Sequence, residues 1–179
     1  MTASTKTTAA IDWPRDIHGA LTAAEVRQVA YVPDAGHARL IELCHADPAM
    51  RAVALTTEEE GVAMLSGAWL GGQRGALLMQ SSGVGNCINM MSLMRTCRFP
   101  MLMFITMRGE WEEFNPWQVP MGSMVEPVMK LCEAEVYRAR EPGEVKGLAE
   151  RAVQQAYGDE RIVALLLSQQ LIGKKVWTK

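Results

Sequence analysis

The chain has 179 residues, of which 49% are hydrophobic and 21% are charged, and its formal net charge is −2 with a sequence pI of about 5.9. This composition is typical of a globular protein with one sizeable core, and the lack of a basic stripe argues against nucleic acid or an anionic membrane as a partner. Neither a secretory signal nor an apolar run of eighteen residues is found. We therefore expect a cytoplasmic protein that has no membrane partner.

The first residues are small and polar, so we assign residues 1–15 to a flexible tail and residues 16–179 to a single domain. Thr22 and Glu25 have the spacing of a capping box, which predicts the start of a short helix. Strands and helices then alternate. In chain order we expect a strand over 29–33, a helix over 37–45, a strand over 51–56, a helix over 58–70, a strand over 75–80, a helix over 84–96, a strand over 101–106, a loop over 107–120, a helix over 123–132, a strand over 134–138, a helix over 142–157 and a strand over 161–168.

Near-continuous apolar strands that alternate with helices predict a doubly wound α/β fold, with a mostly parallel six-stranded sheet and helices on both faces. Ligands of such sheets gather at the carboxyl ends of the strands. Four segments that carry polar or glycine residues are expected at that edge: 33–36, 57–60, 81–86 and 107–118.

The sulfur-containing residues indicate packing rather than metal binding. The four cysteines contain no CxxC pair and show no ligand spacing with the three histidines, so we expect reduced core thiols and no metal site. The thirteen methionines are expected to fill the core, and some of them to line a pocket or an interface.

Three consecutive glutamates, Glu58, Glu59 and Glu60, open the expected helix over 58–70. The positive end of a helix dipole favours carboxylates, so ordinary first-turn acids are one interpretation. Successive helix residues point about 100° apart, so at least one glutamate is expected to face the sheet. The helix is apolar nearly all round, and periodicity does not say which one.

Two further segments are candidates for function. Gly83 and Gly85 are expected at a strand-to-helix turn, but Ile88 stands where a dinucleotide motif requires its third glycine, which disfavours such a site. The loop over 107–120 is long for its position. It is expected to be either a surface lid or subunit contact, or a substrate loop in which Arg108 grips an anion bidentately.

Taken together, "VPD", "EEEGVAMLSGAWLGG", "LLMQSSGVGNCIN", "RFPMLMFITMRGE", "PWQVPMG" and "VALLLSQQLIG" resemble the pyrimidine-binding (PYR) half of thiamine diphosphate-dependent decarboxylases. The resemblance is nearest to the alpha subunit of sulfopyruvate decarboxylase and to phosphonopyruvate decarboxylase, and it covers residues 32–172. The catalytic glutamate of this family lies ten residues before an aromatic residue. Counting back from Trp69 gives Glu59, although the family more often has tyrosine at the aromatic position.

The resemblance implies a role for each candidate residue. Glu59 is expected to hydrogen-bond N1′ of the aminopyrimidine ring and so to activate the cofactor in 2-oxo acid decarboxylation. The residues expected to bind the cofactor are Glu59, Ser82, Gly83, Val84 and Asn86, and those expected to bind the substrate are Asp34, Arg108 and Gln118.

The family's diphosphate site carries a GDG signature, and the 179 residues contain none. The resemblance therefore implies a beta subunit that holds the diphosphate and Mg²⁺, with no metal ligand on this chain, in a hetero-oligomer such as α2β2 or larger. Three alternatives stay open: a carboligase or lyase on the same scaffold, a non-catalytic regulatory subunit, and a nucleotide-binding flavodoxin-like module. The identity of the 2-oxo acid also stays open.

Overall fold

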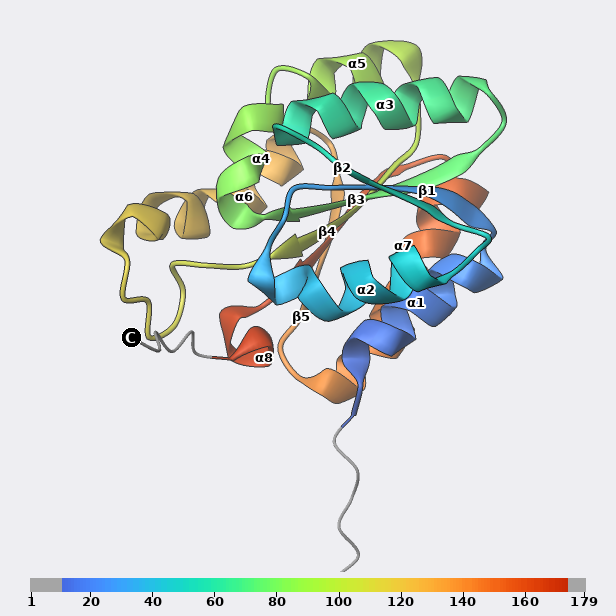
Figure 1. Ribbon diagram of the computed structural model, residues 1–179. Coiled ribbons are helices and arrows are strands. Elements are labelled where there is room, and N and C mark those ends of the chain that lie inside the picture. The colour runs from blue at the N-terminus through green and yellow to red at the C-terminus, as the bar shows by residue number, and fades with distance from the viewer. Residues whose placement is uncertain (1–10, 174–179) are drawn as a thin grey trace, which may run out of the picture.

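The computed structural model describes residues 11–173, which form a parallel sheet covered by helices on both faces (Figure 1). The strand order is β2-β1-β3-β4-β6-β5, and all five neighbouring pairs are parallel. The expected fold class is confirmed. The strands are β1 (Val26–Tyr31), β2 (Arg51–Ala54), β3 (Arg74–Gln80), β4 (Met101–Thr106), β5 (Glu135–Ala139) and β6 (Ile162–Leu167).

The helices divide between the two faces of the sheet, and each set encloses its own hydrophobic cluster. The first face carries α1 (Trp13–Ala23), α2 (Ala38–Ala46), α7 (Pro142–Gly158) and α8 (Gln169–Ile172). The second face carries α3 (Glu58–Leu70), α4 (Ser81–Cys87), α5 (Met91–Cys97) and α6 (Val119–Leu131). Two short 3-10 helices, η1 (Ala35–His37) and η2 (Pro116–Gln118), lie in the connections after β1 and β4.

The central strands supply both clusters because successive side chains of a strand point to opposite faces. Leu78 and Phe104 face the first cluster, whereas Leu77 and Met103 face the second. Both β4 and β6 are buried along their whole length, which explains their continuous apolar sequences. Methionines fill the second cluster, as expected, and seven of them are buried there: Met79, Met91, Met94, Met101, Met103, Met107 and Met129.

The capping-box prediction at Thr22 was wrong, because a helix ends there instead of beginning. Helix α1 starts at Trp13 with Pro14 in its first turn, and it buries Ile17 and Leu21. The Thr22 hydroxyl donates to the carbonyl of His18 one turn earlier (3.0 Å). Residues 13–15, which the sequence placed in the tail, are therefore helical, and residues 1–10 lie outside the described residues.

The single helix expected over 84–96 is two helices, because α4 ends at Cys87 and α5 begins at Met91. Helix α4 follows β3 directly at Ser81, so Gly83 and Gly85 lie inside a helix and not in a turn. Glycine and serine are poor helix formers, which concealed the start of α4 in the sequence. The loop after β4 is also shorter than predicted, since η2 and α6 begin before Pro120, and α8 was not predicted.

The four cysteines are buried to different degrees. Cys44 and Cys87 are buried free thiols and Cys132 is partly buried, but Cys97 is exposed, so the core expectation was wrong for that residue.

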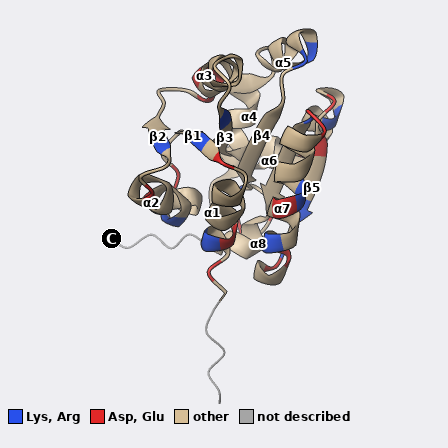
Figure 2. Cartoon of the chain, turned by 90° about the vertical axis from the view of Figure 1, so that its right-hand side faces the viewer, with Lys and Arg blue, Asp and Glu red and all other residues tan. Residues whose placement is uncertain are grey.

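Basic and acidic residues lie interspersed on the side drawn in Figure 2. Within the described part of the chain, no helix has the length and apolar character needed to cross a membrane.

Candidate functional site

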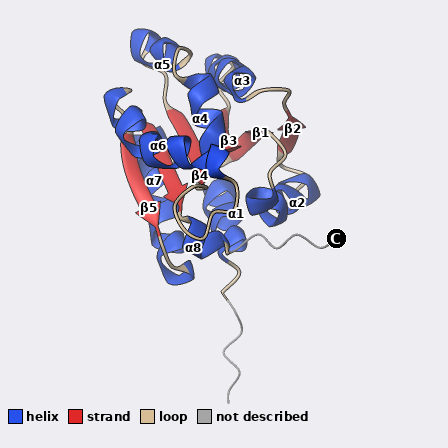
Figure 3. Ribbon diagram, turned by 90° about the vertical axis from the view of Figure 1, so that its left-hand side faces the viewer, coloured by secondary structure: helices blue, strands red, loops and turns tan. Residues whose placement is uncertain are grey.

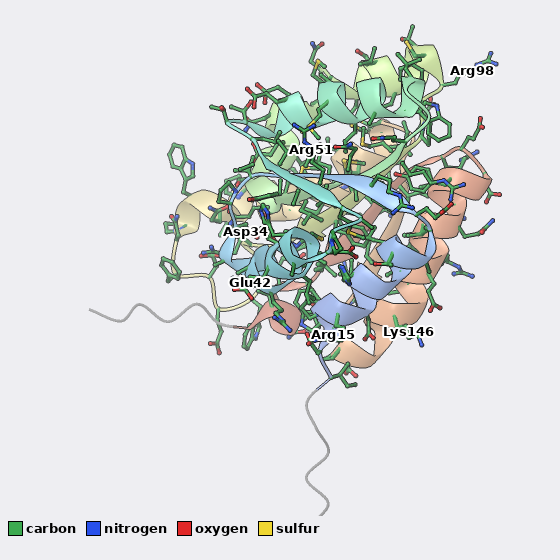
Figure 4. The ribbon with its side chains drawn as sticks, turned by 45° about the vertical axis from the view of Figure 1, so that its right-hand side comes forward. Arg15, Asp34, Glu42, Arg51, Arg98 and Lys146 are labelled. Carbon is green, nitrogen blue, oxygen red and sulfur yellow. The ribbon has the colours of Figure 1, made fainter. Side chains whose placement is uncertain are left out.

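Hydrogen bonds join the predicted functional segments at the carboxyl ends of the strands. Asp34, labelled in Figure 4, follows β1 and accepts from Gln80 Nε2 (3.1 Å) and Thr106 Oγ1 (2.5 Å), which end β3 and β4. The backbone N–H of Arg108 donates to Ser81 Oγ (3.1 Å). The segments that follow β1, β3 and β4 therefore form one connected edge, as the sequence predicted for a parallel sheet.

The three glutamates at the start of α3 point to three different environments. The Glu60 carboxylate is exposed and accepts from the backbone N–H of Thr56 (2.8 Å). Glu58 is buried and accepts from Asn86 Nδ2 (2.7 Å). Glu59 is half-buried, and its Oε2 is fully covered yet has no hydrogen-bond partner. Buried polar atoms in proteins are nearly always paired, so this oxygen marks a place where a ligand can supply a hydrogen bond.

Glu58 fixes α3 against α4, a role that the sequence did not reveal. A Cβ atom at Gly83 would overlap the Glu58 carboxylate, so this side chain fills the space that the missing Cβ leaves. Asn86, expected to bind the cofactor, donates a side-chain N–H to Glu58. Burial raises the pKa of the neighbouring Cys87 thiol to about 12, and the carboxylates of Glu58 and Glu59 add to this shift.

The other cofactor candidates on α4 offer the ligand different groups. Ser82 Oγ donates to Gln80 Oε1 (3.1 Å), which leaves its oxygen available as an acceptor. Val84 is 1% exposed and packs in the second cluster. Its side chain therefore belongs to the core, and only its main chain can contact a ligand.

A cavity of about 170 Å³ lies beside Asp34, and its lining brings together two of the three predicted substrate residues. Its walls are Asp34, Ala35, Gly36, Thr106, Arg108, Gln169, Ile172 and Gly173. Gln118 does not line it, although its Oε1 is buried without a hydrogen-bond partner. A larger hollow of about 610 Å³ lies between α1 and α7, beside the beginning of β3, at the opposite edge of the sheet.

The Arg108 guanidinium is held by a carboxylate of its own loop. Its Nε and Nη2 donate to Glu113 Oε2 (2.7 Å) and Oε1 (2.5 Å), and the two side chains are 13% and 4% exposed. This pairing lowers the pKa of Glu113 to about 2. The bidentate fork expected to grip a substrate anion therefore faces Glu113, and Arg108 contributes its remaining surface to the cavity.

Gln169, at the start of α8, anchors the loop from the other side. Its Oε1 accepts from the backbone N–H groups of Glu110 (2.9 Å) and Trp111 (3.0 Å), and its Nε2 donates to Glu113 Oε2 (2.9 Å). Sequence reasoning missed this buried residue. The available signal was a polar "SQQ" directly after an apolar strand, at the edge where ligands gather.

His37 is a second buried polar residue that the sequence left unassigned. It is 0% exposed and its Nε2 donates to the carbonyl oxygen of Phe104 (3.0 Å), while Nδ1 has no partner. Burial lowers the pKa of His37, which favours the neutral ring. Among residues 11–173, no three or more His, Cys, Asp and Glu side chains are arranged to hold a metal ion.

The sequence relatives found by comparison with known proteins are named as decarboxylases or as decarboxylase subunits. No family model matches the chain. It is 36% identical over 151 residues to sulfopyruvate decarboxylase subunit alpha of Methanocaldococcus jannaschii, and the match covers 84% of this chain and 89% of that protein. It is 33% identical over 152 residues to the protein of the same name from Methanococcus maripaludis, and that match covers 84% of this chain and 91% of the relative. It is also 37% identical over 122 residues to phosphonopyruvate decarboxylase of Streptomyces viridochromogenes, covering 67% of this chain but only 31% of that protein.

Among solved structures, 2-oxoglutarate:ferredoxin oxidoreductase from Magnetococcus marinus shares the fold, with a TM-score of 0.69 at 10% identity. That match covers 89% of this chain and 29% of the longer protein, and it bears on the fold alone. The sequence relatives carry the family assignment. The chain belongs to the family of the sulfopyruvate decarboxylase alpha subunits, which is related to phosphonopyruvate decarboxylase, as its motifs predicted.

Proposed function

We propose that this chain is the alpha subunit of a thiamine diphosphate-dependent 2-oxo acid decarboxylase, in which Glu59 activates the cofactor. The observation that carries the proposal is the covered, unpartnered Oε2 of Glu59 at the ligand edge of the sheet. A ring nitrogen such as N1′ of the aminopyrimidine fits this oxygen, because a carboxyl group can share a proton with it. Glu58 and Glu60 already have partners within the chain.

The residues around Glu59 have separate tasks in this proposal. When bound, the cofactor supplies the electron sink that allows a 2-oxo acid to lose CO2. Glu59 holds a proton at N1′, and the first turns of α4 from Ser82 to Asn86 form the adjoining wall. Asp34 and Arg108 line the cavity of about 170 Å³, which suits a small 2-oxo acid. The buried Glu58 holds α3 against α4, and this contact fixes the orientation of the helix that carries Glu59.

The proposal includes a partner. The two relatives from Methanocaldococcus jannaschii and Methanococcus maripaludis are named as alpha subunits, and no GDG run occurs in the 179 residues. We propose that a beta subunit with that signature holds the diphosphate and Mg²⁺, in a cytoplasmic hetero-oligomer such as α2β2 or larger. A carboligase or lyase reaction would use the same residues. A purely regulatory subunit has no need of the unpartnered acid at Glu59.

The experiment compares Glu59→Gln with Glu60→Gln in the complex reconstituted with the GDG-containing partner, thiamine diphosphate and Mg²⁺. Glutamine keeps the size of the side chain but does not share a proton, so Glu59→Gln should lower turnover by about two to four orders of magnitude. Glu60→Gln is the matched control, because Glu60 is exposed and caps the preceding loop. CO2 release from a panel of 2-oxo acids is the measurement. Near-normal turnover in Glu59→Gln, with the loss in Glu60→Gln, contradicts the assignment.

A further inference from the structure

Exposed apolar side chains are concentrated after β4. Of the nine large apolar side chains exposed in residues 11–173, five lie between Trp111 and Met124. We call these five the aromatic ridge, and their exposed fractions are 85% for Trp117, 47% for Phe114, 46% for Val119, 44% for Met124 and 36% for Trp111. Single exposed apolar side chains are normal on a protein surface, but five within one short segment indicate a segment that another molecule covers.

The loop that carries the ridge is held in place by hydrogen bonds within the chain itself. The Glu113 carboxylate accepts from the Arg108 fork, from the backbone N–H groups of Gly109 (3.1 Å) and Asn115 (3.0 Å), and from Gln169. Asn115 Oδ1 in turn accepts from the backbone N–H of Trp117 (3.1 Å). A surface that is already ordered loses little conformational entropy on binding, which favours docking and not the movement of a lid.

The ridge is continuous with the candidate site. Its loop begins at Arg108, which lines the cavity and whose backbone is tied to Ser81 at the start of α4. Helix α6, which carries Val119 and Met124, lies beside α4 (Figure 3). A Cβ atom at Gly85 would lie 3.6 Å from the sulfur and terminal carbon of Met121, so the two helices are in close contact. A molecule that covers the ridge therefore also borders the site.

We propose that the aromatic ridge is the docking surface for the partner subunit, with Trp117 as its anchor; this rests on the proposed function, in which that partner completes the site. Tryptophan is one of the residue types enriched among those that dominate binding energy at protein interfaces, and Trp117 is supported by an ordered loop. The occupant is the partner because the loop that carries the ridge begins at Arg108, which lines the cavity. A subunit that closes the cavity therefore lies next to this loop. The loop is thus an interface element.

The test is Trp117→Ala in the full chain, with the dissociation constant for the GDG-containing partner measured by calorimetry in the presence of thiamine diphosphate and Mg²⁺. The dissociation constant should rise by about 10- to 100-fold, as expected for an interface anchor. Turnover at saturating partner should stay within about twofold, because Trp117 does not line the cavity. Leu131→Ala is the control, since Leu131 is 79% exposed at the far end of α6, and it should leave the constant unchanged.

A second measurement uses the unaltered chain, so it does not depend on the folding of a variant. Hydrogen exchange of backbone amides in 111–119 should slow when the partner is added. An active complex that is insensitive to Trp117→Ala, or whose amides in this segment exchange unchanged, overturns the ridge proposal alone. Self-association of the chain that is lost in Trp117→Ala, with partner affinity unchanged, assigns the ridge to a second copy and also overturns it. A failure of the wild-type chains to form any complex overturns the proposed function and the ridge proposal together.

Discussion

At the scale of single residues, Glu113 is a carboxylate that several neighbours hold at once. Its contact with Arg108 lowers its pKa to about 2, against an ordinary value of 4.5. A carboxylate with a lowered folded-state pKa stabilises the fold fully above its unfolded pKa, and this contribution is lost as the pH falls from about 4.5 toward 2. Because both side chains are largely buried, the contribution at neutral pH is on the order of 2 to 3 kcal/mol.

Glu113→Gln tests this contribution. The substitution leaves the Arg108 charge buried without a counter-charge, so the free energy of unfolding at pH 7 should fall by about 3 kcal/mol. The variant should also lose less stability than wild type between pH 4.5 and pH 3. Urea unfolding at these pH values is the measurement. Glu42→Gln is the control, since Glu42 is 68% exposed in a surface pair and should have little effect. Equal pH dependence of Glu113→Gln and wild type contradicts the assignment.

The glutamates show how far sequence reasoning reaches at this scale. Helix geometry predicted that the three would diverge. The resemblance to the decarboxylase family, through its ten-residue spacing to an aromatic residue, selected Glu59, whose assignment stays a prediction. The burial of Glu58 was not predictable, because its partner Asn86 lies 28 positions later and α3 is apolar on most sides. The pairing of Arg108 with Glu113 was equally hidden, since the conformation of the loop depends on Gln169.

At the scale of elements, α3 is held close to the sheet by a glycine. A Cβ atom at Gly61 would lie 2.5 Å from Leu77 Cδ1 and 2.8 Å from Leu55 Cδ1, whereas one at Gly67 of the same helix meets nothing within 4 Å. Gly61→Ala should therefore lower the free energy of unfolding by about 1 to 3 kcal/mol. Turnover should also fall, because the added methyl group moves α3, and Glu59 with it, away from the sheet. Gly67→Ala, the matched control, should be neutral or stabilise by up to about 1 kcal/mol. Urea unfolding measures both, and equal stability of the two variants contradicts this packing.

Helix α3 and helix α4 also show what decides whether an element can be predicted. The bounds of α3 were predicted to the residue, because acidic residues at its first turn and the pair Gly71-Gly72 after its last turn are strong local signals. Helix α4 contains two glycines and two serines in seven residues, so local propensity contradicted its helical structure. Its close packing against Glu58 is a tertiary contact, which no local signal contains.

At the scale of the whole molecule, the chain presents one half of the proposed site. The cofactor's pyrimidine ring would meet Glu59 and α4, while its charged tail would be held by the partner. Such a fragment of a ligand does not offset the cost of immobilisation well. We therefore expect the isolated chain to bind thiamine diphosphate at least about 100-fold more weakly than the complex with the GDG-containing partner and Mg²⁺ does. Calorimetry measures both, and tight Mg²⁺-dependent binding by the chain alone contradicts the division between two subunits.

The contact between Glu58 and Gly83 limits how the sequence of this site can evolve. A side chain at position 83 and a glutamate at position 58 require the same volume, so the two positions are not free to vary independently. Among related sequences, any residue larger than glycine at 83 should occur together with a shorter residue at 58. The order of such changes also matters. Shortening residue 58 first opens the space that a new Cβ needs, whereas a new Cβ at position 83 in the presence of Glu58 displaces that side chain from its hydrogen bond with Asn86.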